Sequence, residues 1–164
     1  MDTNEESKIA LFEEIRIQVE IIMPILATLK SEFGEEKAYS IIRKALSPHI
    51  REVYHNIAKR KSGSPFKKWN DVWDEIRPRI GQCVEREYIT NNNSNRQYNV
   101  HKCKFADYFR ELNEPELGKI LMCDFDYYIA EIGEPVVKLI RTKTIMEGCD
   151  CCDFRYTFNH DNEE

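Results

Sequence analysis

The chain has 164 residues, of which 41% are apolar and 32% charged, and its formal net charge is −5. A chain of this length suits one domain, taken as residues 1–164, and can bury enough surface to fold without disulfides or a metal. The negative charge argues against general affinity for nucleic acid or for anionic membranes, so a small-molecule substrate is the expected partner.

The sequence predicts neither a secretory signal nor a membrane-spanning segment. Residues 1–16 are acidic before any apolar stretch, whereas a secretory signal begins with basic residues followed by apolar ones. The longest apolar run, residues 21–29, contains a proline and is too short to cross a bilayer. We therefore expect a cytoplasmic protein with reduced cysteines, which weighs against disulfides.

The first half of the chain is predicted to be helical. Apolar residues recur at steps of three and four over residues 7–30, although Pro24 should kink or restart that helix. A second helix begins after a turn at Gly34, is interrupted at Pro48 and ends before a Gly-Ser-Pro stretch. A third helix at 66–81 carries large apolar residues expected to anchor the core, namely Trp69, Val72, Trp73 and Ile76.

The second half mixes strand and helix patterns. Residues 83–90 and 96–103 are predicted to form a β-hairpin around the asparagine-rich turn 91–95. Two helices are predicted next, at residues 104–113 and 115–133. A second hairpin follows, with strands at residues 135–148 and 152–158 and its turn at Gly148. The predicted fold is α+β, a single domain with N-terminal helices packed on a small antiparallel sheet formed by the two hairpins. Residues 1–6 and 159–164 are expected to fray.

Three cysteines lie close together near the end of the chain, at positions 149, 151 and 152. Cys149 and Cys152 have the C-x-x-C spacing of zinc sites, and His101 with Cys103 would add a second pair if their strand lies beside the final hairpin. The alternative is that each cysteine is a buried thiol that packs as a small hydrophobic residue.

Strand alternation divides the residues after these cysteines into two sets. In the predicted strand 152–158, Cys152 shares a face with three aromatic residues, Phe154, Tyr156 and Phe158. Asp153 and Arg155 point to the opposite face. Cys152 is therefore expected to face apolar neighbours.

A second thiol lies near a carboxylate in the middle of the chain. Cys123 and Asp126 are three residues apart, which places them on one face of a helix. Such a pair can act as a nucleophile with a proton-transferring partner. A carboxylate alone raises the pKa of a thiol, however, so the pair needs a cation, a helix N-terminus or a charged substrate. The alternative is a helix cap or surface acid beside a buried thiol.

Four segments, taken in order, resemble a known family. They are "EFGEEKAYSIIRKAL", "CKFADYF", "PELGKILMCDFD" and "TKTIMEGCDCCDFRY". The ordered set resembles the L-2-amino-thiazoline-4-carboxylic acid hydrolase family over roughly residues 30–158. Its C-x-x-D and G-x-x-x-C-D-F motifs specify Cys123 and Cys152. Cys149 and Cys151 lie at unspecified positions of the second motif and are additions particular to this chain. The family pattern aligns with Cys103, Cys123, Asp126, Cys152 and Asp153.

The resemblance implies a small cytoplasmic hydrolase. The named activity opens the thiazoline ring of 2-aminothiazoline-4-carboxylate with water and gives N-carbamoyl-cysteine. The resemblance implies Cys123 or Cys152 as the nucleophile, with Asp126 as the general base or as the partner of the substrate amidinium. We expect further substrate contacts from Cys103, Asp153 and Arg155. Charge alone suggests that Arg155, or Arg141 in its place, holds the substrate carboxylate.

Two other functions are compatible with these residues. One is a non-catalytic ligand-binding module with a cysteine-lined pocket. The other is a zinc- or redox-responsive protein that uses the C-terminal cysteines. The sequence identifies no cofactor, and it allows an oligomer. If a divalent metal took part, its hard oxygen ligands would come from Asp124, Asp126, Asp150 and Asp153.

Overall fold

Three long helices form the N-terminal half of the protein. The computed structural model describes residues 9–162, and its first helices are α1 (Leu11–Phe33), α2 (Glu35–Lys59) and α3 (Pro65–Ile80). The expected fraying of residues 1–6 concerns residues outside this described part. None of the helices in the described part is long and apolar enough to cross a membrane.

Both α1 and α2 continue through a proline, so the helix does not restart at Pro24, and the interruption expected at Pro48 is wrong. Each proline is exposed, and the helix that contains it is anchored by buried residues before and after it. The missing amide hydrogen bond therefore lies on the water-facing side, where solvent can satisfy the freed carbonyl. Tertiary packing here outweighs the local cost of proline.

The strands form one antiparallel sheet, which confirms the predicted α+β fold. The first hairpin joins β1 (Val84–Asn91) to β2 (Asn95–Cys103), and the second joins β3 (Val137–Ile140) to β4 (Cys152–Phe158). The strand order is β1-β2-β4-β3, so β2 and β4 connect the two hairpins in the middle of the sheet.

Local chemistry explains the two hairpin connections. In the first, the Asn92 side chain accepts hydrogen bonds from the backbone amides of Ser94 and Asn95, each at 2.9 Å, which fixes the turn. In the second, the predicted strand 135–148 is shortened to β3, and a loop with a 3₁₀ turn replaces its end. Gly148 ends that turn with φ of 92°, the left-handed conformation that glycine adopts without strain.

The helical segment after β2 is broken by a wider turn. It comprises α4 (Lys104–Glu111), α5 (Pro115–Gly118), a π-helical turn and α6 (Phe125–Ile132). The π turn covers Lys119–Cys123, and the Asp124 amide bonds to the Lys119 carbonyl at 2.9 Å, five residues back. Such single π turns occur frequently at functional sites.

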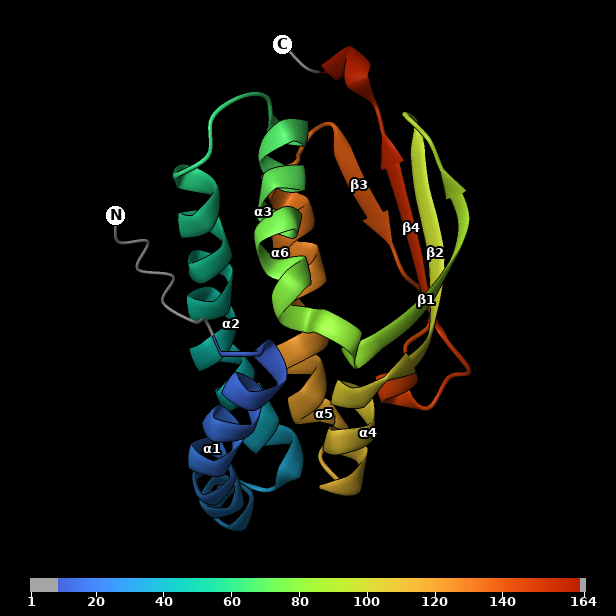
Figure 1. The fold of residues 1–164 in the computed structure, drawn as a ribbon. Helices are drawn as coiled ribbons and strands as arrows, with labels where there is room; N and C mark the ends of the chain where they lie inside the picture. Colours follow the sequence, from blue (N-terminus) through green and yellow to red (C-terminus); the bar gives the residue numbers. More distant parts are fainter. Residues whose placement is uncertain (1–8, 163–164) are drawn as a thin grey trace, which may run out of the picture.

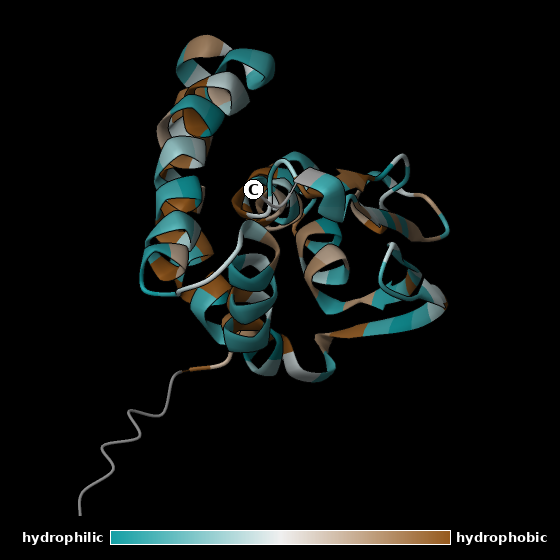
Figure 2. Ribbon diagram, turned by 90° about the horizontal axis from the view of Figure 1, so that it is seen from above, coloured by the Kyte–Doolittle hydropathy of each residue, from teal (hydrophilic) through white to brown (hydrophobic). Residues whose placement is uncertain are grey.

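The helices lie on one face of the sheet, as expected (Figure 1). The α3 and α6 helices lie next to the sheet, and α2 packs on them from the far side. Trp69 of α3 contacts the rings of Tyr156 and Phe158 on β4, at centroid distances of 5.2 and 5.3 Å. Seen from above, the helices carry apolar and polar bands side by side, as amphipathic helices on a core do (Figure 2).

The described residues that follow β4 contact other parts of the fold. The Asn159 amide donates to the Val136 carbonyl at 2.9 Å, and His160 contacts the Asn93 carbonyl at 2.9 Å through Nε2. Residues 159–162, which were expected to fray, are therefore attached to the sheet at this end. Residues 163–164 lie outside the described part.

Candidate active site

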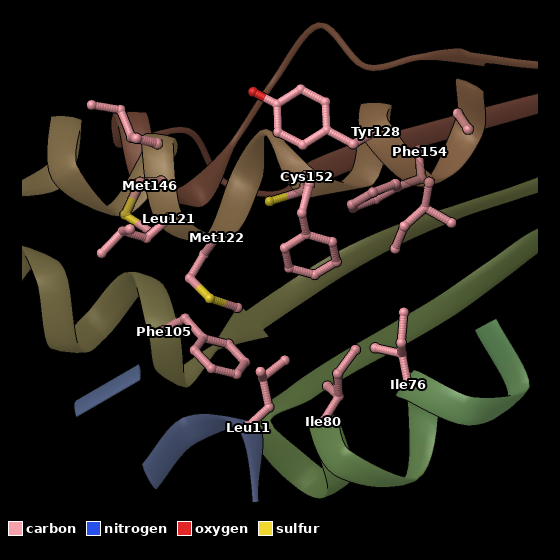
Figure 3. Packing of buried hydrophobic residues seen from close by; sticks show 14 of the residues in the cluster. Leu11, Ile76, Ile80, Phe105, Leu121, Met122, Tyr128, Met146, Cys152 and Phe154 are labelled. Carbon is pink, nitrogen blue, oxygen red and sulfur yellow. The ribbon is translucent and has the colours of Figure 1, made fainter. Parts of the chain in front are cut away.

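A cavity of about 80 Å³ lies between the inner face of the sheet and helices α3, α4 and α6. Its wall is largely apolar, which is typical of a small-molecule site. Figure 3 shows the Cys152 sulfur in this apolar region, together with Phe105, Met122 and Met146. The lining residues with a thiol or a charged side chain are Arg86, Cys103, Cys123, Asp126, Arg141 and Cys152.

Cys152 begins β4 and faces the cavity, as strand alternation predicted. It is buried together with the three aromatic residues of the same strand face, Phe154, Tyr156 and Phe158. The Ile145 amide donates a hydrogen bond to its Sγ at 3.2 Å. Burial raises the pKa of Cys152, while this amide and the Arg141 charge oppose the rise.

Cys123 and Asp126 also reach the cavity, and both line its wall. Cys123 ends the π turn, and Asp126 follows in the first turn of α6. Burial raises the pKa of Asp126 to about 6, although Arg141 partly opposes the shift. Burial also raises the pKa of Cys123 far above its ordinary value, so this thiol is neutral at physiological pH.

Arg141 supplies the cation that a thiol–carboxylate pair requires. Its Nη1 lies 2.5 Å from Oδ2 of Asp126, and its Nη2 donates to the Cys123 carbonyl at 2.9 Å. The guanidinium lies 5.1 Å from the ring centroids of both Tyr127 and Phe154. The Arg141 side chain is only 4% exposed, so Arg141 and Asp126 form a buried pair, and two aromatic rings lie next to the guanidinium.

Cys103 reaches the cavity because of an irregularity in the first hairpin. Val84 pairs with Cys103, whereas Arg86 pairs with Val100, so β2 contains one extra residue between these pairs. This bulge re-aims the end of the strand and brings Cys103 to the same cavity as Val100. Burial raises the pKa of Cys103 to about 11, although the nearby amides of Ala106 and Phe105 oppose the shift.

The structure does not bring Asp153 and Arg155 to the cavity. Asp153 accepts hydrogen bonds from the amides of Thr142 at 2.8 Å and Lys143 at 2.6 Å, and so holds the connection between β3 and β4. Arg155 donates to the Tyr98 carbonyl at 3.0 Å and to Asn99 at 2.8 Å. Both residues alternate with Cys152 and Phe154, so they lie on the outer face of β4. Neither residue lines the cavity, so the substrate contacts expected of them do not belong to this cavity.

The residues considered for zinc do not converge. His101 lies on the outer side of the bulge and pairs with Glu87 at 3.3 Å, whereas Cys103 faces the cavity. Cys149 and Cys151 are free thiols outside the cavity lining. Among residues 9–162, no three His, Cys, Asp or Glu side chains are placed to hold a metal ion together.

The aspartates considered as hard oxygen ligands each have a different protein partner. Asp126 and Asp153 make the contacts given above. Asp124 pairs with Arg43 of α2, and Asp150 lies 3.5 Å from the Lys143 ammonium group. Each of these four carboxylates therefore contacts a different part of the protein, and they do not gather around one point.

Sequence reasoning missed Arg86, which lines the cavity from β1. Its neighbours Glu85 and Glu87 are exposed, whereas Val84 and Arg86 are half-buried on the inner face. The signal was present in the alternation V-E-R-E, in which the arginine shares the face of the valine. An arginine on the apolar face of a strand indicates a polar feature inside the fold.

The assembled groups favour nucleophilic addition with proton transfer. Three thiols, a carboxylate with a pKa of about 6 and two guanidinium groups line one largely apolar cavity. A buried carboxylate of this kind accepts and returns a proton near neutral pH, and a thiol is a strong nucleophile once it loses its proton.

A known protein family matches most of the chain. No curated protein matches the chain. The family described as L-2-amino-thiazoline-4-carboxylic acid hydrolase matches residues 14–156, and so begins earlier than the resemblance identified from about residue 30. This match spans α1 to β4 and includes all the cavity residues with a thiol or a charged side chain. The chain therefore belongs to the L-2-amino-thiazoline-4-carboxylic acid hydrolase family.

Proposed function

We propose that this protein opens the ring of 2-aminothiazoline-4-carboxylate, or of a closely related C–N/C–S heterocycle, with water. The observation that carries the proposal is the arrangement of Cys152 and Asp126 in one cavity, with Arg141 fixed on Asp126. The family match supports the reaction class, and the small apolar cavity supports a compact substrate.

The first step forms a bond between the Cys152 sulfur and the ring carbon that lies between nitrogen and sulfur. The Asp126 carboxylate accepts the thiol proton as the sulfur attacks. The ring C–S bond then breaks, and the departing sulfur takes the proton back from Asp126. The product of this step is an isothiourea whose carbon is bonded to the Cys152 sulfur. The former ring sulfur is now a free thiol on the opened substrate chain.

The second step removes the substrate from the enzyme. Water adds to the same carbon while Asp126 again accepts a proton, and the bond to Cys152 then breaks. The proton returns to the Cys152 sulfur, and N-carbamoyl-cysteine is released. One water molecule is consumed in the whole reaction, and no group is oxidised or reduced.

Cys152 is the nucleophile that the surroundings favour. An amide already donates a hydrogen bond to its sulfur, and such a donor stabilises a thiolate. Among residues 9–162 no amide donates to the Cys123 sulfur, and burial strongly raises the pKa of this thiol even though the Arg141 charge opposes the rise. We assign Cys103 and Cys123 to the wall of the cavity, where they contact the substrate.

A thiol-release assay tests the proposal. Purified protein is mixed with 2-aminothiazoline-4-carboxylate, and new thiol is measured over time, with the product identified by mass spectrometry. We expect thiol and N-carbamoyl-cysteine to appear in equal amounts, at a rate proportional to protein concentration. Tight binding of the substrate without any thiol release would instead support the non-catalytic ligand-binding role.

The rate should depend on pH through Asp126. Because the carboxylate must accept a proton, kcat/KM should rise with pH up to about 6, the pKa to which burial raises Asp126, and then level off. Asp126→Asn should lower kcat/KM by about 100- to 10,000-fold and abolish this rise. An unchanged rate in Asp126→Asn, or a profile that is flat across the acidic range, would remove Asp126 from the mechanism.

A further inference from the structure

Arg86 is a cation in the cavity wall that forms no ion pair with an acidic side chain of residues 9–162 and acts on Asp126 only through its charge. Its guanidinium lies 5.6 Å from the ring centroid of Tyr98, which supports one flat side of the group. A half-buried charge that lacks a partner is costly, which makes it a candidate ligand-binding group.

The neighbouring acids cannot supply this partner because they are used on the other face of the sheet. Glu85 pairs with Lys102 at 2.9 Å, and Glu87 pairs with His101 at 3.3 Å. Asp126, the acid of the cavity itself, is held by Arg141 at 2.5 Å. The outer-face pairs and the buried pair thus leave Arg86 available to a ligand.

The charges that line the cavity add up to an excess of one positive charge. Two guanidinium groups, from Arg86 and Arg141, face one carboxylate, from Asp126. The cysteines do not offset this excess, because burial raises the pKa of Cys103, Cys123 and Cys152 and keeps them neutral. A ligand with a negative group is therefore attracted to the Arg86 side of the cavity.

We propose that Arg86 is the residue that recognises the carboxylate of a small heterocyclic ligand in this cavity. The proposal rests on the function proposed above and assigns to Arg86 the role that charge alone had suggested for Arg155 or Arg141. A guanidinium suits the role because its planar fork binds both oxygens of a carboxylate. The Asp126–Arg141 pair then remains free to act at the ring carbon.

The test uses two probes that cannot be hydrolysed at an amidine carbon. L-thiazolidine-4-carboxylate has a similar ring and the carboxylate, and thiazolidine has the ring alone. Calorimetry should show that the wild-type protein binds the acid, and that Arg86→Gln weakens this binding by about 10- to 100-fold. The affinity of Arg86→Lys for the acid should lie between those of wild type and Arg86→Gln, because lysine keeps the charge but loses the bidentate contact. Binding of thiazolidine should be the same in all three proteins.

A turnover measurement with 2-aminothiazoline-4-carboxylate accompanies the binding test. Arg86→Gln should raise KM by a similar factor and leave kcat within about threefold of wild type. Arg16→Gln is the matched control, because it removes the same charge from an exposed position on α1. Circular dichroism checks that each variant is folded.

The possible results separate this proposal from the proposed function. Binding of the acid that depends on Arg86, without any ring opening, supports carboxylate recognition and overturns only the hydrolase reaction. Ring opening with equal KM in wild type and Arg86→Gln overturns the role of Arg86 and leaves the hydrolase standing. Equal affinity of Arg86→Gln and wild type for the acid, or failure of wild type to bind it, also overturns the role of Arg86.

Discussion

Replacing Cys152 with alanine is expected to lower the rate of ring opening by at least about 1,000-fold, because the variant has no nucleophile at the position that the substrate carbon reaches. The overall fold should survive, since the change removes one sulfur atom from a wall made mostly of larger apolar side chains. Initial rates of thiol release at saturating substrate measure the effect.

Matched cysteine variants make this result specific. Cys149→Ala makes the same chemical change close by in the sequence but outside the cavity, and should keep the wild-type rate. Cys103→Ala and Cys123→Ala, which alter the cavity wall, should lower the rate less than Cys152→Ala does. If Cys123→Ala abolishes turnover while Cys152→Ala retains it, the roles of the two thiols are reversed.

Replacing Arg141 with glutamine is expected to destabilise the protein by about 3–5 kcal/mol at pH near 7, because it leaves the Asp126 carboxylate buried without its partner. The Asp126 side chain is 10% exposed, so water cannot replace the lost guanidinium. Urea unfolding followed by circular dichroism gives the free energy of unfolding for wild type and variant.

The pH dependence of this loss identifies its cause. Asp126 already has its folded pKa raised from 3.8 to about 6, and removing Arg141 takes away an interaction that lowers it. A folded-state pKa that is raised favours the folded state at low pH, and this contribution is lost as pH rises through that pKa. The deficit of Arg141→Gln should therefore be smaller at about pH 5 than at about pH 8.

Two further variants complete the stability test. Arg141→Met combined with Asp126→Leu removes both charges and should recover most of the lost stability, because neither partner is left unpaired. Arg16→Gln should change the free energy of unfolding by less than about 0.5 kcal/mol, since its pair with Glu13 is exposed. A deficit in Arg141→Gln that is below about 1 kcal/mol and independent of pH would contradict the account of this pair.

The sequence contained enough information for the sheet, the helices and the inward direction of Cys152. Period-two alternation over residues 152–158 fixes which side chains share a face, and only one face has the aromatic residues that a core needs. The three-residue spacing of Cys123 and Asp126 survives the π turn, because Asp126 follows it in the first turn of α6.

Other parts of the site depend on how strands meet, which alternation alone does not show. Strand alternation turns Cys152 toward the core and turns Asp153 and Arg155 away from it. A family pattern shows which positions recur, but it does not show on which face of a strand their side chains lie. Alternation places Arg86 on the face of Val84, but the register of β1 on β2 decides that this face meets the cavity, and Cys103 reaches the cavity because of the bulge between the two strands. Neither the register nor the bulge follows from local residue preferences.

The contact of Arg141 with Asp126 could not be predicted from the sequence for a different reason. It lies in the long connection between β3 and β4, where no periodicity applies, and it reaches Asp126 only after the chain has folded. The two prolines inside α1 and α2 show the reverse case, because local preference argued for a break and packing on either side prevailed.

The central claim is that Cys152 forms a covalent intermediate during ring opening. The most direct measurement is mass spectrometry of protein quenched with acid during turnover of 2-aminothiazoline-4-carboxylate, with product measured in the same samples from wild type and Cys152→Ala. We expect the wild-type protein to form product and to gain the mass of one whole substrate on the peptide that contains Cys152. Product formation by Cys152→Ala at the wild-type rate, or an adduct on a different cysteine, would contradict this account.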